Sequence, residues 1–160
     1  MNEEEILFAI PVRIDGRRQT NLKCISNDGN VRWDRVYNSD IEELIYAVLL
    51  LNDSTILLHI GWYLDADSWS NNLVRFDQNG DIVSTHAWHI PMRYSLGQMN
   101  DGRIIIPVTV PTDQYHRAPA VFVTNISGDS ITFIQYEEQL YLGTVGAVPT
   151  IEGDMIIYCN

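Results

Sequence analysis

Residues 100–110 read NDGRIIIPVTV, in which an Asn-Asp-Gly turn signal leads, after one arginine, into three isoleucines and a proline. A closely similar phrase, NDSTILLHIGW, occupies residues 52–62. The apolar run after each turn does not alternate with polar residues, which favours a strand covered on both faces. The recurrence of a turn followed by a buried strand predicts a repeated β unit.

Two phrases alternate along the whole chain. The first phrase is an apolar stretch, a turn and a hydrophobic strand, and it occurs at 47–60, 95–108 and 146–159. The second phrase is a strand, a glycine turn and another strand, and it occurs at 22–37, 73–88 and 121–136. Copies of each phrase lie about fifty residues apart, a spacing typical of propeller blades and other repeat architectures.

Each phrase has the chemistry of a β-hairpin. Asp-Gly and Asn-Gly supply the positive φ angles that tight two-residue turns demand, so Gly29, Gly80 and Gly128 are expected at equivalent turns. Ile131 stands one position further from its glycine than Val31 does, which predicts a third turn one residue longer. The N-terminal Ile10-Pro11-Val12 corresponds to Ile106-Pro107-Val108 in the first phrase.

Two hairpins per repeat predict an all-β, β-propeller-like fold with four-stranded blades. We expect a single domain over residues 1–160, with about three blades in total. The complete repeats are expected at 43–89 and 94–137, and the partial repeats at 5–37 and 141–159. A two-sheet sandwich is the alternative architecture. Within 39–50, SDIEELIYAVLL also carries the capping signal of a short helix.

About three blades cannot close a ring, which typically needs four to eight. An open fan would expose apolar sheet edges that invite pairing. We therefore expect a homodimer, or a subunit of a larger assembly, in which the tail of one chain completes the blade begun by the head of another. The Ile156–Cys159 strand of one chain would then share a blade with residues 22–31 of its partner.

Composition excludes some classes of partner. The net charge of −11 argues against nucleic acid and anionic membranes as partners, because both need a basic surface. No apolar run approaches the roughly 20 residues of a membrane span, and the acidic N-terminus lacks the basic region of a secretory signal, so we expect a cytoplasmic protein. Cys24 and Cys159 form no disulfide framework or zinc motif and are expected as buried small side chains. No cofactor is predicted.

The turn phrases resemble those of the sialidase and Asp-box repeat propellers. The stretch Ser26-Asn27-Asp28-Gly29-Asn30-Val31-Arg32-Trp33 is similar to the Asp-box turn S-x-D-x-G-x-x-W. Residues 99–107, MNDGRIIIP, resemble the L-x-D-G-R-x-x-x-P phrase at the inner strand of these proteins. The resemblance implies a six-bladed propeller. A sialidase site would draw three arginines, a Tyr/Glu pair and an aspartate from the whole ring.

Residues 65–72, DADSWSNN, form an acidic, Asn-rich stretch that we expect to be a loop between two strands. An exposed tryptophan beside Asp and Asn is a usual means of gripping a sugar ring or a protein partner. We therefore predict a binding surface at one rim of the blades, with Asp65, Trp69, Asn71 and Asn72 among the most exposed residues. Its residues are Asp65, Asp67, Trp69, Asn71 and Asn72. Calcium is an alternative ligand for these oxygens, although the EF-hand glycine and glutamate are missing and no metal is predicted.

No other constellation carries a reaction. His59, His86 and His89 are expected to be packed or hydrogen-bonded, and the pairs Glu42/Glu43 and Glu137/Glu138 to be solvated charge. No nucleophile elbow, phosphate loop or metalloprotease motif occurs. The sequence therefore favours a non-enzymatic recognition or assembly module that binds protein or glycan. A sialidase-like glycoside hydrolase made by two chains is the alternative.

Overall fold

A computed structural model describes residues 5–37, 41–63, 69–88, 95–113, 116–136, 145–150 and 155–159. Every regular element in these ranges is a β-strand, so the all-β prediction is confirmed. No helix in the described ranges is long and apolar enough to cross a membrane. The chain divides into two compact units, Met1–Ile90 and Pro91–Asn160, and each unit is described by itself. The single domain over 1–160 stays a prediction.

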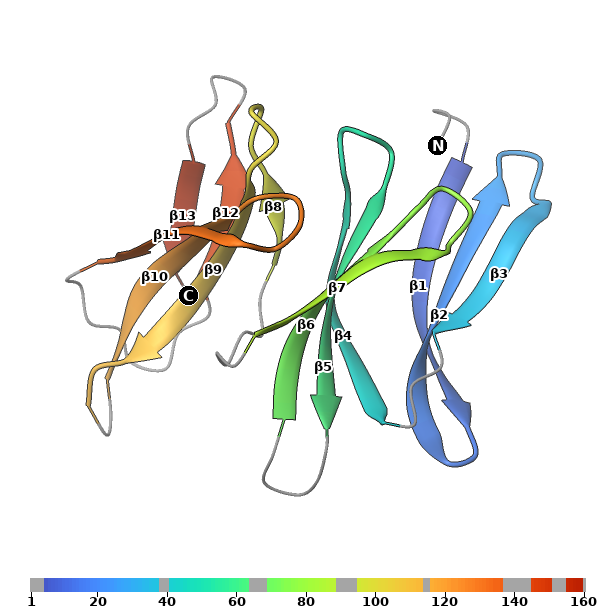
Figure 1. Ribbon diagram of the computed structural model, residues 1–160, viewed down its shortest axis with the longest axis horizontal. Helices are drawn as coiled ribbons and strands as arrows, with labels where there is room; N and C mark the ends of the chain where they lie inside the picture. The colour runs from blue at the N-terminus through green and yellow to red at the C-terminus, as the bar shows by residue number, and fades with distance from the viewer. Residues whose placement is uncertain are drawn as a thin grey trace. The chain divides into compact units, whose positions relative to one another are not determined.

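The strands form antiparallel meanders in which neighbours in sequence are neighbours in space (Figure 1). The first unit holds the strands β1 (Glu5–Ile14), β2 (Arg17–Ser26), β3 (Val31–Tyr37), β4 (Glu42–Leu50), β5 (Ile56–Tyr63), β6 (Trp69–Phe76) and β7 (Ile82–Trp88). The second unit holds β8 (Gly97–Gln98), β9 (Ile104–Pro111), β10 (Arg117–Thr124), β11 (Ser130–Gln135), β12 (Val145–Pro149) and β13 (Met155–Cys159).

These strands form the first sheet (β1–β3), the second sheet (β4–β7), the third sheet (β8–β11) and the C-terminal hairpin (β12–β13). The bounds of these sheets lie close to the expected ranges 5–37, 43–89, 94–137 and 141–159, and the repeat itself stays a prediction. The alternative of a helix within 39–50 is wrong, because Glu42–Leu50 is a strand whose backbone pairs with β5.

The β2–β3, β6–β7 and β10–β11 turns share one geometry. In each, the residue three before the glycine accepts from the glycine N–H and donates its own N–H to the residue after the glycine. Gly29, Gly80 and Gly128 all have positive φ, so their predicted equivalence is confirmed. The glycine alone takes the left-handed conformation, as in a type I turn with a G1 bulge, so the expected two-residue turns are wrong here.

The third of these turns is also no longer than the others. Thr124 pairs with Ser130, just as Ile25 pairs with Val31 and Phe76 with Ile82. The prediction of an extra residue was wrong because the strand after Gly128 begins at Ser130, one residue before the isoleucine used for the count. Asp15 and Gly16, both with positive φ, do make a two-residue turn, between β1 and β2.

The first and second sheets pack face to face. Their shared core consists of Leu22, Ile56, Leu58, Ile60, Val74 and Phe76, with Leu7, Ala9, Trp33, Tyr37 and Trp62 packed around it. Trp33 also lies on the β6–β7 turn, where its indole N–H donates to the Gln78 carbonyl at 2.7 Å. A Cβ at Gly80 would come within 2.8 Å of the Trp33 ring, so this turn needs glycine for space as well as for φ.

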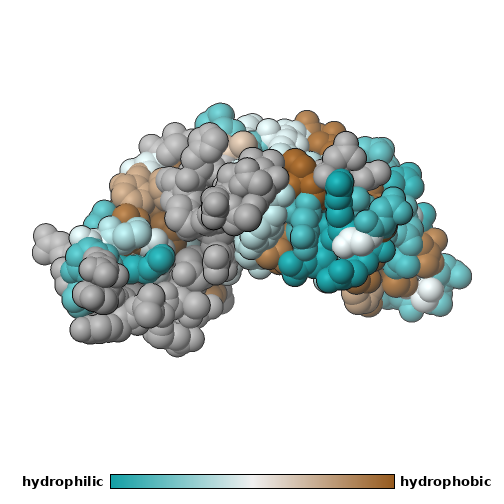
Figure 2. Space-filling model, turned by 90° about the horizontal axis from the view of Figure 1, so that it is seen from below, coloured by the Kyte–Doolittle hydropathy of each residue, from teal (hydrophilic) through white to brown (hydrophobic). Residues whose placement is uncertain are grey.

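The second unit has its own small core of Ile105, Val121 and Val123, with Met99 packed against it. Strands β5 and β9 are buried on both faces, as the continuous apolar runs predicted. Apolar side chains also reach the surface elsewhere, and Figure 2 shows them as brown areas among hydrophilic teal.

Strand registers give a residue-by-residue correspondence between sheets. Ile6 pairs with Ile25 before the Gly29 turn, as Ile56 pairs with Phe76 before the Gly80 turn and Ile104 with Thr124 before the Gly128 turn. Ile6, Ile56 and Ile104 are therefore equivalent. The sequence match of Ile10 to Ile106 was two residues out of register, which keeps the side chains on the correct face because strands repeat every two residues.

Candidate functional site

The predicted binding stretch falls at the connection between β5 and β6. Asp65 and Asp67 lie outside the described residues. Trp69 is the first residue of β6 and its backbone pairs with Tyr63. Asn71 and Asn72 lie inside β6 and are only 1% and 0% exposed. The prediction that both asparagines are among the most exposed residues is wrong, because the strand begins at Trp69, four residues earlier than the polar sequence indicated.

Asn71 belongs to a buried polar contact on one face of the second sheet. Its pairing opposite Gly61 brings its side chain diagonally toward His59, and the His59 Nε2 to Asn71 Oδ1 distance is 3.1 Å. The Tyr46 ring lies 5.0 Å from the His59 ring and covers Gly61, where a Cβ would meet it at 2.6 Å. His59 is therefore a packed, hydrogen-bonded histidine, as predicted.

Asn72 points to the opposite face, toward the first sheet. Its Nδ2 donates to Ser70 Oγ at 3.2 Å, but its buried Oδ1 has no hydrogen-bond partner among the described residues. The same holds for the buried atoms Trp62 Nε1 and Thr20 Oγ1 within the described part of the chain. Unpaired buried polar atoms each cost about 1–3 kcal/mol, so this end of the sheet interface favours ligands or waters that can pair with them.

Glu43 belongs to a group of side chains between the first and second sheets that we call the inner cluster. Its members are Thr20, Tyr37, Glu43, Trp62 and Asn72. Glu43 is 1% exposed, stands opposite Trp62 and accepts a hydrogen bond from the Thr20 backbone N–H at 2.8 Å. The expectation of solvated charge was wrong for Glu43, because its side chain faces the first sheet. The neighbouring Glu42 remains partly exposed and pairs with Arg18 at 2.6 Å.

Tyr37 closes the same cluster from β3. Its ring stacks on Trp62 with a centroid separation of 6.4 Å. Burial raises the pKa of the Tyr37 phenol, the nearby Glu43 charge raises it further, and a hydrogen bond with Thr85 only partly offsets them. The phenol therefore stays neutral at physiological pH. The inner cluster therefore supplies hydrogen-bonding groups at the interface of the first and second sheets.

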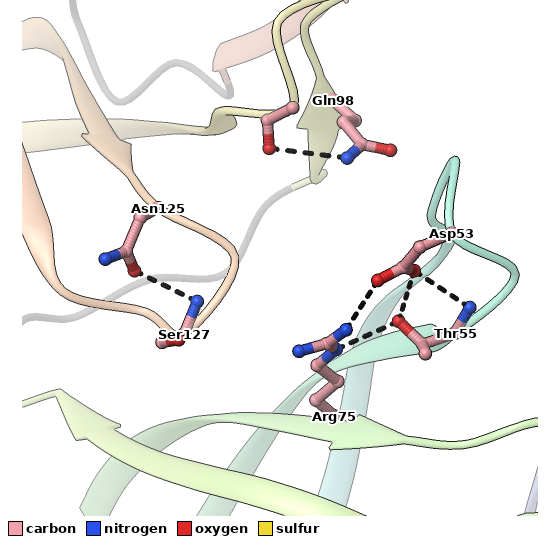
Figure 3. Close-up of polar contacts among 7 residues, drawn as sticks. Asp53, Thr55, Arg75, Gln98, Asn125 and Ser127 are labelled. Carbon is pink, nitrogen blue, oxygen red and sulfur yellow. Dashed lines mark hydrogen bonds and ion pairs between the residues drawn. The ribbon is translucent and has the colours of Figure 1, made fainter.

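A second polar group sits at the β4–β5 turn. The Asp53 carboxylate accepts from the Thr55 backbone and hydroxyl at 3.0 and 2.6 Å and from Arg75 at 2.5 Å, while Arg75 Nε donates to Thr55 Oγ1 at 2.9 Å (Figure 3). Burial raises the pKa of Asp53, but the bonds from Thr55 and Arg75 outweigh it and hold the pKa below its usual value. Figure 3 also shows Asn125 accepting from the Ser127 N–H in the β10–β11 turn.

Other aspartates have the same structural use. Hydrogen bonds from neighbouring side chains and turn backbone lower the pKa of Asp28, Asp34, Asp77 and Asp101. In Asp77 the main cause is the bond from the Asp81 backbone N–H, and in Asp101 it is the bond from the Arg103 side chain. These carboxylates are ionised groups that hold turns and strand pairs.

Apart from Asn72, the members of the inner cluster were not predicted as site residues from the sequence. Glu43 and Thr20 lie on different sheets, and only the packing of β2 against β4 brings them together. A usable signal was the position of Glu43 on the same strand face as Ile45, two residues later in β4.

No protein-family model matches the chain, and no curated protein matches it. Among solved structures, the chain is similar to a protein of unknown function from Bacteroides caccae, with a TM-score of 0.58 and 15% sequence identity. The alignment covers 98% of this chain and 49% of that chain, so the chain spans about half the length of the structure it matches. At this identity, the match shows a shared fold.

Proposed function

We propose that the chain forms blades of a β-propeller that serves as a non-enzymatic recognition module for a glycan or protein. The proposal rests chiefly on the face-to-face stacking of two antiparallel meanders of the same design in the first unit. The third sheet repeats the strand order and turn geometry. Radial repetition of such sheets is the construction principle of propellers.

The binding surface would be the rim at the β5–β6 connection, which contains Asp65, Asp67 and Trp69. Loops on a rigid scaffold are the usual carriers of binding residues. Here the strands on both sides of the connection are fixed by the inner cluster, because Trp62 precedes the connection and Asn72 follows it. Asn71 and Asn72 would support the rim from within rather than contact a ligand.

The alternative is a sialidase-like glycoside hydrolase built by two chains. Glycosidases need a carboxylic acid whose pKa is raised, paired with a second carboxylate. The pKa values of Asp28, Asp77 and Asp101 are lowered instead, because each carboxylate accepts hydrogen bonds within a turn. These three aspartates therefore do not fit the role of that acid, which supports recognition over hydrolysis.

The test is binding to an immobilised glycan array, followed by titration of the strongest glycan against Trp69→Ala. We expect Trp69→Ala to weaken binding by about tenfold or more, equivalent to about 1.4 kcal/mol, and Val83→Ala, on the exposed side of β7, to bind as the wild type does. Equal binding by Trp69→Ala and wild type would remove the rim from the proposal.

A fluorogenic sialoside assay on the same preparation separates the two functions. The recognition proposal predicts no turnover above the buffer rate. Turnover that is lost when the protein is heat-denatured would establish the hydrolase instead.

A further inference from the structure

The strand registers define two kinds of sheet face. The first sheet presents Leu7, Ala9 and Leu22 to the second sheet, and we name this kind of face the trailing face. The opposing face of the second sheet consists of Ile56, Leu58, Ile60, Val74 and Phe76, and we name this kind of face the leading face. A joint between sheets is thus a trailing face packed on a leading face.

In the two four-stranded sheets, the second strand of the meander, β5 or β9, is buried on both faces. In β5 and β9 the leading residues Leu58 and Ile106 and the trailing residues Leu57 and Ile105 are all buried. Their burial shows that the repeat is built to be covered on both sides.

The first sheet departs from this pattern on its leading face. Ile6, Phe8 and Ile10 are equivalent to Ile56, Leu58 and Ile60, yet they are 51%, 41% and 40% exposed. They form an apolar stripe along β1 beside the Lys23–Asp34 ion pair. The surface view in Figure 2 includes brown areas over this sheet.

The C-terminal hairpin departs from the pattern on the opposite face. Pro149 pairs with Met155 across the turn as Leu50 pairs with Ile56 and Gln98 with Ile104, so Ile156 is equivalent to Leu57 and Ile105. Ile156 therefore lies on the trailing face. It is 58% exposed, and its cross-strand partner Val148 is 51% exposed.

We propose that the leading face of the first sheet binds the trailing face of the C-terminal hairpin from a second copy of this chain. The two exposed faces are the two halves of the joint that the first and second sheets already make. In this joint, Val148 and Ile156 would pack against the stripe of Ile6, Phe8 and Ile10. The contact would repeat the packing of Leu7 and Ala9 against the leading face of the second sheet. Two copies related by a two-fold axis would make this head-to-tail joint twice.

Stacking fits the strand correspondence better than a shared sheet does. Strands β1 and β13 both occupy the position of β5 and β9, so a sheet that combined β12–β13 with β1–β3 would hold this position twice. In the stacked joint, each sheet keeps its own strands and only side-chain faces meet.

The test uses light scattering of the 160-residue chain at about 100 µM, where weak association is favoured by mass action. The wild type should have twice the chain mass of 18.3 kDa or more. Phe8→Glu and Ile156→Lys should each be monomeric at the same concentration, with unchanged far-UV circular dichroism. Val83→Lys, an equally exposed valine on β7, is the control and should associate as the wild type does.

Mixing the two variants distinguishes head-to-tail stacking from other joints. The intact hairpin of Phe8→Glu can still bind the intact first sheet of Ile156→Lys, so the mixture should give a one-to-one heterodimer. If first-sheet faces paired with each other, Ile156→Lys would still dimerise, and that result would overturn the proposal. A monomeric wild type at about 100 µM would overturn it as well.

Discussion

Strands β1–β2 of the first sheet and β5–β6 of the second sheet are built alike and buried differently. In each pair, an isoleucine of the first strand pairs with the residue four positions before the turn glycine, Gly29 or Gly80. Both pairs also have large apolar residues at equivalent positions. Leu58 is nevertheless buried, while Phe8 is exposed. The difference shows that local sequence decides the strand and its turn, whereas the neighbouring sheet decides which face becomes core.

The largest expected contrast is between alanine substitutions at these two equivalent positions. Leu58→Ala should lower the free energy of unfolding by about 2–5 kcal/mol, because it leaves a cavity between two sheets. Phe8→Ala should lower it by less than about 1 kcal/mol in the monomer, because the side chain is not enclosed. Urea unfolding at about 1 µM protein measures both. Equal losses would mean that the first sheet is covered in the folded monomer.

The turn glycines offer a second contrast between the same sheets. Gly29→Ala should cost about 1–2 kcal/mol, because alanine is strained at a positive φ. Gly80→Ala should cost more, because its Cβ would also meet the Trp33 ring. The shift in thermal midpoint of each variant measures the order. A larger loss at Gly29 would contradict the packing of Trp33 on the β6–β7 turn.

The loss of stability at low pH should differ between the β6–β7 turn and the β10–β11 turn. The pKa of Asp77 is lowered in the folded protein, chiefly by the bond from the Asp81 N–H, so its stabilising contribution is complete above the unfolded pKa. The contribution is lost as the pH falls through the lower, folded pKa. Asn125 fills the same position in the β10–β11 turn with an uncharged acceptor. Asp77→Asn should therefore lose less stability than the wild type between about pH 5 and pH 2, measured by urea unfolding at each pH.

The sequence predicted more of the fold than of the candidate site. Glycine spacing and continuous apolar runs were enough for the strands, the equivalent turns and the doubly buried β5 and β9. The exposure of Asn71 and Asn72 was predicted wrongly, because a polar pair resembles a loop until its partners are known. Asn71 is held by His59 on the next strand, and that contact depends on the register of β5 and β6.

Glu43 shows the same limit in a different form. Adjacent carboxylates ordinarily remain in water, and Glu42 does stay partly exposed. Glu43 is buried because alternate residues of β4 face opposite sides, and its side faces the Thr20 N–H of another sheet. The alternation can be read from the sequence, but the position of the Thr20 N–H cannot, because Thr20 lies 23 residues away and on another sheet.

The smallest expected effect concerns the β4–β5 turn. Ser54 has a φ of 63° at the position that glycine fills in the β6–β7 turn. Ser54→Gly should raise the free energy of unfolding by about 0.5 kcal/mol, because relief of left-handed strain is partly offset by the greater freedom of glycine in the unfolded chain. A small rise in the thermal midpoint would show it, and a clear fall would mean that Ser54 makes a contact worth more than the strain.

The most direct test of whether a second copy covers the exposed leading face of the first sheet is the thermal midpoint of unfolding as a function of protein concentration. Association stabilises the folded state by mass action, so the wild-type midpoint should rise steadily between about 1 and 100 µM. The midpoint of Phe8→Ala should rise less over the same range, and that of Val83→Ala should rise as in the wild type. A wild-type midpoint that does not change with concentration would contradict the claim that the exposed leading face of the first sheet is made to be covered by a second copy.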